Sequence, residues 1–259
     1  MPPRRAVAVA SSALLLLAAQ ACGLTVTNER PSYDELQPAE KDVVQTVLAE
    51  LTGFDAQLRA RTGDTIASVL NPERIDVAFR GLIFTGNVGD GVVHVSTWEN
   101  LTDEQRNRVK EWFAQPTLEG ARQTYARFFY RFLAVSQGAK QFMYEVLTPA
   151  WLYEHRSLFS MERDSVRTTM AYYAAVGRQN EMWPFVTSAC APILAKQGPV
   201  YGPHFDKTYL IDHFHELANP RDPTGYMYFL CRWIGQGVLE AGDLSNELNW
   251  LKHDLPRLP

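Results

Sequence analysis

The densest group of side chains that could bind a metal or transfer protons lies between residues 204 and 216. The candidate ligands are His204, Asp206, His213 and Glu216. Imidazole and carboxylate groups together are the ligands of Zn and Fe sites in proteins. If these four side chains converge, with His204 folding back beside the others, they predict a metal-dependent hydrolase with Zn or Fe as its cofactor.

The spacing inside this segment weighs against a single metal site. If 206–217 form a helix, successive residues are rotated by about 100°, so His213 and His215 point about 200° apart. Asp206 and His213 then share one face, and Glu216 lies on another. The segment also lacks HExxH and the other zincin patterns. We therefore favour histidines that pair with acidic neighbours on a helix surface, or a histidine satisfied in the core.

Other patterns that could carry chemistry are weaker. The glycine-rich run GNVGDG at 86–91 has neither Walker nor GxGxxG spacing and no lysine after it, so a hairpin turn is the better interpretation. His94 stands in the β-rich run that follows, and we expect it to be a half-buried strand residue. No serine stands in GxSxG or SxxK, so nothing supports nucleophilic catalysis.

The chain has three cysteines, and their use depends on the compartment. In an exported protein Cys190 and Cys231 would be left as a pair once Cys22 is lipidated, and we predict a disulfide between them. The alternative is two separate buried thiols that act as small apolar residues. No CxxC or CxxCH occurs, which excludes the common redox and c-type haem motifs.

The N-terminus has the parts of an export signal. Arg4 and Arg5 precede an apolar stretch at 6–19, which is shorter than the about 20 residues of a transmembrane span, and Ala-Gln-Ala-Cys follows. This end resembles the bacterial lipoprotein signal, which implies cleavage before Cys22 and a lipid anchor on that cysteine. The same bond also suits ordinary signal peptidase without lipidation, and an uncleaved anchor is a third possibility.

The domain organisation follows from this leader. We expect a signal peptide at 1–21, a tether at 22–38 that contains two prolines, and a single α-helical domain at 39–259. The resemblance implies an exported protein, anchored by lipid on the periplasmic side or at the outer membrane.

Charge and composition narrow the choice of partners. The formal charge is −4, and removal of 1–21 leaves 23 basic and 29 acidic side chains, or −6. No clustered basic region of the kind that binds nucleic acid is present, so we expect no nucleic-acid partner. At 46% apolar residues the chain has ample material for a sizeable core.

Apolar periodicity predicts a mainly α protein, an irregular multi-helix bundle with one small β-hairpin at 81–98. A long helix at 117–147 is the expected hub, because its aromatic residues need other helices to cover them. Arginines interleave with these aromatics, and we expect them to extend to solvent rather than bind an anion. Further on, we expect a short helix at 149–159 and a separate one that Ser160 caps.

The sequence therefore favours a non-enzymatic binding or interaction module of the bacterial envelope. Its expected contacts are the membrane, through the lipid on Cys22, and a protein or a small apolar ligand held between helices. A metal-dependent hydrolase at 204–216 is the alternative.

Overall fold

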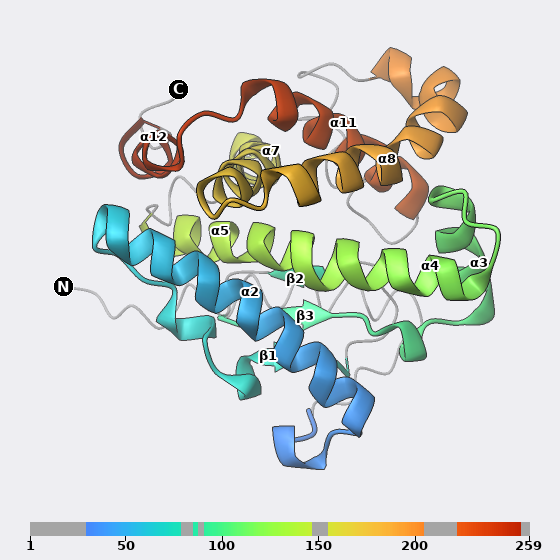
Figure 1. Cartoon of the computed structure of the whole chain (residues 1–259), viewed down its shortest axis with the longest axis horizontal. Helices are drawn as coiled ribbons and strands as arrows, with labels where there is room; N and C mark the ends of the chain where they lie inside the picture. The colour runs from blue at the N-terminus through green and yellow to red at the C-terminus, as the bar shows by residue number, and fades with distance from the viewer. Residues whose placement is uncertain (1–29, 79–84, 88–90, 147–154, 205–221, 255–259) are drawn as a thin grey trace.

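The computed structural model describes residues 30–78, 85–87, 91–146, 155–204 and 222–254, and Figure 1 shows their arrangement. Within these ranges the fold is mainly α, with a small β element, as the sequence predicts. One long helix crosses the middle of the molecule. Helix α2 lies on one side of it, α7 and α8 lie on the other, and the sheet lies below (Figure 1).

The helices of the first half are α2 (Pro38–Thr62), α3 (Asp103–Trp112), α4 (Leu118–Tyr125) and α5 (Leu133–Val146). Those of the second half are α7 (His155–Ala175), α8 (Gln179–Tyr201), α11 (Pro223–Glu240) and α12 (Leu244–Asn249). Single helical turns of the 3-10 type are η1 (Tyr33–Glu35), η2 (Ala67–Val69), η3 (Pro72–Arg74), η4 (Trp98–Asn100) and η6 (Gly202–His204). Two segments are π-helical, η5 (Ala126–Phe132) and η7 (Trp250–Asp254).

The central helix consists of α4, η5 and α5 in succession and spans 118–146. The predicted hub helix is therefore confirmed almost to its ends, although the π-helical turns of η5 were not predicted. Every residue from Phe132 to Met143 is buried. A helix buried on all sides needs neighbours on all sides, and α2, α7 and β2 supply them.

Aromatic side chains form the contact between the central helix and its neighbours. Phe128, Phe129, Phe132 and Phe142 are fully buried, as predicted. The ring of Phe132 stacks on Tyr173 of α7, with 6.3 Å between ring centroids and 15° between planes. The hub is thus held mainly by apolar burial.

Helix α2 approaches the core closely at a glycine. A Cβ atom at Gly53 would lie 2.5 Å from the Tyr172 hydroxyl oxygen, so only glycine leaves room for that ring. The helix ends at Gly63, whose φ of 74° is the left-handed conformation typical of a helix C-terminus. The glycine inside α2 therefore serves close packing.

The sheet has three short strands, β1 (Ile75–Asp76), β2 (Thr85–Asn87) and β3 (Val93–Val95), in the order β1-β3-β2. Strands β2 and β3 are antiparallel, which confirms the predicted hairpin. Strand β1 pairs with β3 in parallel and places Asp76 opposite His94. This strand was not predicted because two residues are too few to show a period.

The prediction for the start of α7 was wrong. The helix begins at His155 and continues through residue 160, so position 160 lies inside the helix and not at its start. Helix α8 has Pro192 inside it and continues for nine residues beyond that proline.

A disulfide joins α8 to α11, as predicted. The Cα atoms of Cys190 and Cys231 are 5.2 Å apart, and both residues are fully buried. The bridge therefore links two helices inside the core.

The described chain begins inside the predicted tether and already contacts the domain there. The Tyr33 backbone N–H donates to the Glu73 carboxylate at 3.0 Å, and Leu36 is buried. The last part of 22–38 is thus packed on the domain. Across the described ranges, none of the helices combines the length and apolar character that crossing a bilayer requires.

Candidate functional site

The predicted metal ligands cannot be compared with one another in space. His204 ends η6, but its side chain is outside the described part, as are Asp206, His213 and Glu216. The Zn or Fe site therefore stays a prediction, and so does lipidation of Cys22. Among the residues that the structure does describe, no three His, Cys, Asp or Glu side chains are placed to hold a metal ion.

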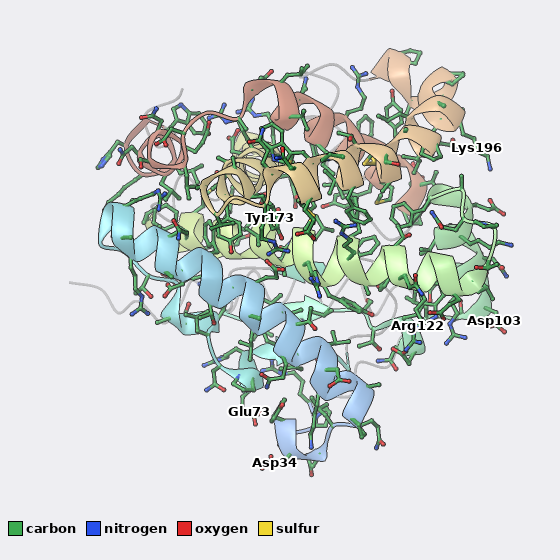
Figure 2. The ribbon with its side chains drawn as sticks, viewed as in Figure 1. Asp34, Glu73, Asp103, Arg122, Tyr173 and Lys196 are labelled. Carbon is green, nitrogen blue, oxygen red and sulfur yellow. A yellow bond between two sulfur atoms is a disulfide. The ribbon has the colours of Figure 1, made fainter. Side chains whose placement is uncertain are left out.

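A groove of about 740 Å³ lies between the first described residues and the segment that leads into β1. One wall consists of Arg30, Pro31, Tyr33 and Leu36, and the other of residues 71–78. Pockets that bind small molecules are commonly about 300–1,000 Å³. The groove lies near the lower edge of the molecule, where Figure 2 labels Glu73, far from Tyr173 at its centre.

Local capping and side-chain contacts hold the two walls. The Asn71 side chain accepts from the Glu73 backbone N–H at 2.9 Å, which starts η3 with Pro72 in its first turn. On the opposite wall the Tyr33 hydroxyl accepts from Gln45 of α2 at 2.8 Å. The bond from Tyr33 to Glu73 then ties the walls together.

An aspartate of the groove lining, Asp76, contacts a histidine of the sheet, His94. One Asp76 oxygen is 3.0 Å from His94 Nδ1, and the other accepts from the Ala78 backbone N–H at 3.1 Å. A carboxylate contact of this kind fixes the orientation of the imidazole ring. His94 is half-buried in β3, as predicted. Its partner was missed because the short strand β1 was missed.

Two exposed arginines on the groove walls have no internal partner. The guanidinium groups of Arg30 and Arg74 make no ion pair or hydrogen bond with the part of the chain that the structure describes, although the Arg74 backbone N–H donates to the Asn71 carbonyl at 2.8 Å. Most other arginines in that part do pair with carboxylates: Arg59, Arg106, Arg108, Arg122, Arg127, Arg163, Arg167 and Arg178. Guanidinium groups on a groove wall offer several N–H donors to a ligand. These two arginines could not be paired from the sequence, because they are 44 residues apart.

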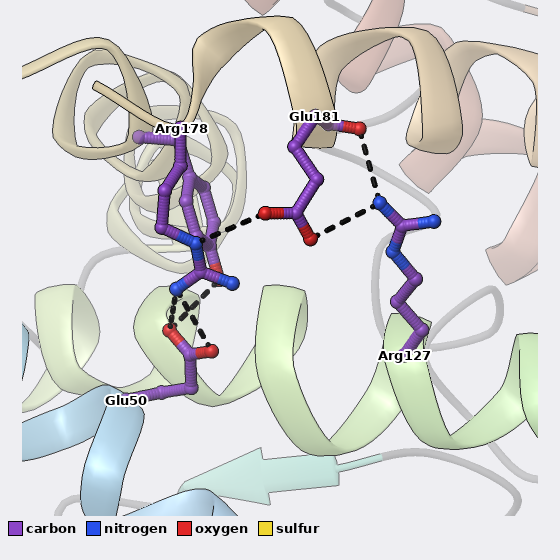
Figure 3. Close-up of polar contacts among 5 residues, drawn as sticks. Glu50, Arg127, Arg178 and Glu181 are labelled. Carbon is purple, nitrogen blue, oxygen red and sulfur yellow. Dashed lines mark hydrogen bonds and ion pairs between the residues drawn. The ribbon is translucent and has the colours of Figure 1, made fainter. Parts of the chain in front are cut away.

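A second polar cluster lies at the centre of the molecule (Figure 3). Glu50 of α2 accepts from Arg178 at 3.0 Å and from the Tyr173 hydroxyl at 3.2 Å. Burial, together with the nearby Glu50 charge, raises the pKa of Tyr173 well above its usual value. The cluster continues through Glu181, which accepts from Arg178 at 3.5 Å and from Arg127 at 3.2 Å. These groups bind one another and tie α2, η5 and α8 together.

The position of Arg127 corrects one expectation from the sequence. Its guanidinium lies over the Phe185 ring at 4.1 Å, in addition to the ion pair with Glu181. It therefore packs on α8 instead of extending freely into solvent. Arg131, one turn later, is exposed as expected.

A third polar cluster joins α5, α7 and α11. Lys140 is 5% exposed and donates to Glu162 at 2.6 Å. The Tyr226 hydroxyl donates to the other Glu162 oxygen at 3.1 Å. Burial, and next the Glu162 charge, raise the pKa of Tyr226 well above its usual value. Because Lys140 and Tyr226 both donate to Glu162, we interpret this cluster as a link between helices.

Comparison with protein-family models, with curated proteins and with solved structures finds no match to this chain. The groove and the two internal clusters are therefore the features of this chain from which a function can be inferred.

Proposed function

We propose that this protein is a lipid-anchored, non-enzymatic binding module of the bacterial envelope, and that its ligand occupies the groove between 30–36 and 71–78. The leader, with its cysteine at position 22, supports the anchor. The groove supports the binding role. Its ligand contacts polar walls, in contrast to the apolar ligand between helices that the sequence suggested.

One observation carries the proposal, namely the difference between the groove and the internal polar clusters. In the clusters around Glu50 and Glu162, charged groups bind one another. In the groove, Arg30 and Arg74 face solvent without a partner among the described residues. Groups that do nothing for the fold are available for a ligand, and the groove has the volume to hold one.

The anchor is tested by fractionation. The wild-type chain should sediment with membranes, and its N-terminal peptide should carry acyl mass on Cys22. The Cys22→Ala variant should be found in the soluble fraction. A wild-type protein that is soluble and carries no acyl mass would contradict the anchor.

Ligand binding is tested by native mass spectrometry of the mature chain, released from membranes in mild detergent. We expect a bound species that tandem fragmentation identifies. The double variant Arg30→Ala, Arg74→Ala should lose it. Arg131→Ala should keep it, because Arg131 is exposed on η5 and outside the groove lining. The absence of any bound species, or equal retention by the groove variant, would overturn the proposed site.

A further inference from the structure

We propose that the groove binds the phosphate group of an anionic phospholipid in the membrane that holds the Cys22 anchor. This inference depends on the proposed function and names the ligand of the same site. It is carried by the chemistry of the groove walls and by the short chain between the anchor and the groove.

The arginines define the chemistry of the ligand. The planar guanidinium group presents several N–H donors in a geometry that matches phosphate oxygens. Arg30 comes from one wall and Arg74 from the other, so a phosphate between the walls can be approached from both sides. Both side chains are exposed, so neither has to leave a buried site in order to bind.

The acidic residues of the lining are already engaged within the domain. Glu73 accepts the Tyr33 backbone N–H, and Asp76 accepts from Ala78 and contacts His94. Neither carboxylate forms an ion pair with Arg30 or Arg74 in the described part of the chain. The arginines therefore keep their donors for a ligand, while the carboxylates hold the walls.

The length of the chain before the groove identifies the source of the phosphate. Seven residues lie between Cys22 and Arg30, so eight residue-to-residue steps join them. An extended chain covers at most about 3.5 Å per residue, so this segment reaches no further than about 28 Å. A lipid on Cys22 thus keeps one wall of the groove within that distance of the membrane surface. Head groups of the same leaflet are then the most abundant phosphate source within reach.

The net charge of the chain cannot attract it to an anionic membrane, so any attraction must come from a local site such as the groove. The mature chain has a formal charge of −6, which an anionic membrane repels. Attraction must therefore come from a local group of cations. An arginine near an anionic bilayer contributes enough to change binding about 5-fold, so the two groove arginines together change it about 25-fold.

The experiment uses the mature chain with Cys22→Ala, which lacks the lipid, and measures its co-sedimentation with vesicles. We expect binding to vesicles of equal parts phosphatidylglycerol and phosphatidylcholine, and weak binding to phosphatidylcholine alone. Arg30→Ala and Arg74→Ala should each weaken binding about 5-fold. Arg74→Lys should keep part of it, and the control Arg131→Ala all of it. Circular dichroism checks that each variant is folded.

Three results would overturn the inference. The first is no binding to phosphatidylglycerol vesicles, and the second is an equal loss for Arg131→Ala and the groove variants. The third is binding of inorganic phosphate alone that is as tight and abolishes vesicle binding, because the ligand would then be a soluble anion. If native mass spectrometry still finds a different ligand that depends on Arg30 and Arg74, the proposed function stands and only the phospholipid fails.

Discussion

The centre of the molecule and its groove use the same residue type in opposite ways. At the centre, Arg127 and Arg178 lie against aromatic rings and bind carboxylates that other elements supply. In the groove, Arg30 and Arg74 have no such partner in the described structure. The first pair is part of the fold, and the second pair is the one that we propose for ligand binding.

This difference predicts that the central arginines affect the stability of the fold and that the groove arginines affect ligand binding. An arginine that satisfies a buried carboxylate cannot be removed without leaving that carboxylate unpaired, which costs free energy of unfolding. An exposed arginine without a partner contributes little to that free energy. Substitutions at the centre should therefore lower stability, and substitutions in the groove should leave it unchanged.

The largest loss should come from the hub. Phe132→Ala should lower the free energy of unfolding by about 3–5 kcal/mol, because a fully buried ring is lost and a cavity remains. Urea denaturation of the mature Cys22→Ala chain measures this. Leu118→Ala, at a 45% exposed position on the same long helix, is the control and should cost less than about 0.5 kcal/mol. Equal losses would mean that the aromatic contacts do not hold the hub.

Loss of the disulfide should come next. The double variant Cys190→Ala, Cys231→Ala opens a bridge across 41 residues and should cost about 2–4 kcal/mol. A reductant should lower the denaturation midpoint of the parent chain and leave that of the variant unchanged. If reductant has no effect on the parent under denaturing conditions, the bridge is not formed in the protein.

Removal of Arg178 should cost about 1–3 kcal/mol, because Glu50 would remain buried without its cation. The double variant Arg178→Ala, Glu50→Gln should recover part of the loss, since the unpaired charge is gone. Denaturation of both variants and of Glu50→Gln alone gives the coupling between the two residues. A coupling energy near zero would mean that the Arg178–Glu50 pair does not stabilise the fold, contrary to the difference drawn above.

The smallest expected effects on stability compare an arginine of the central cluster with arginines that have no side-chain partner in the described structure. Arg127→Ala should lower the free energy of unfolding by only about 1 kcal/mol, because the ion pair and the ring contact that it removes are both partly exposed. Arg74→Ala and Arg131→Ala should each change stability by less than about 0.5 kcal/mol. If Arg74→Ala costs as much as Arg127→Ala, the groove arginine has a structural role and the proposal loses its main support.

Patterns of long period were predictable from the sequence. The hub helix at 118–146 and the helix at Pro38–Thr62 show apolar residues at helical spacing over many turns. The start of α3 has a local sequence signal as well, because Thr102 and Gln105 have the spacing of a capping box and form one. The disulfide followed from cysteine count and an export signal.

Features made by contacts between distant residues could not be predicted in this way. Asp76 meets His94 because β1 pairs with β3, and the groove lies between two segments that the Tyr33–Glu73 hydrogen bond joins across 40 residues. The π-helical turns of η5 have no local sequence signal that we recognise. Ser160 failed as a predicted cap because a serine that suits a helix start is also tolerated inside a helix.

The disulfide has a consequence for proteolysis. Cys190 and Cys231 close a covalent loop that contains all four residues predicted as metal ligands. A protease that cuts any single peptide bond within this loop leaves two fragments joined through the sulfur atoms. The nicked chain therefore stays in one piece, heavier only by the water that hydrolysis adds, until it is reduced, and α8 and α11 stay attached to each other across the cut.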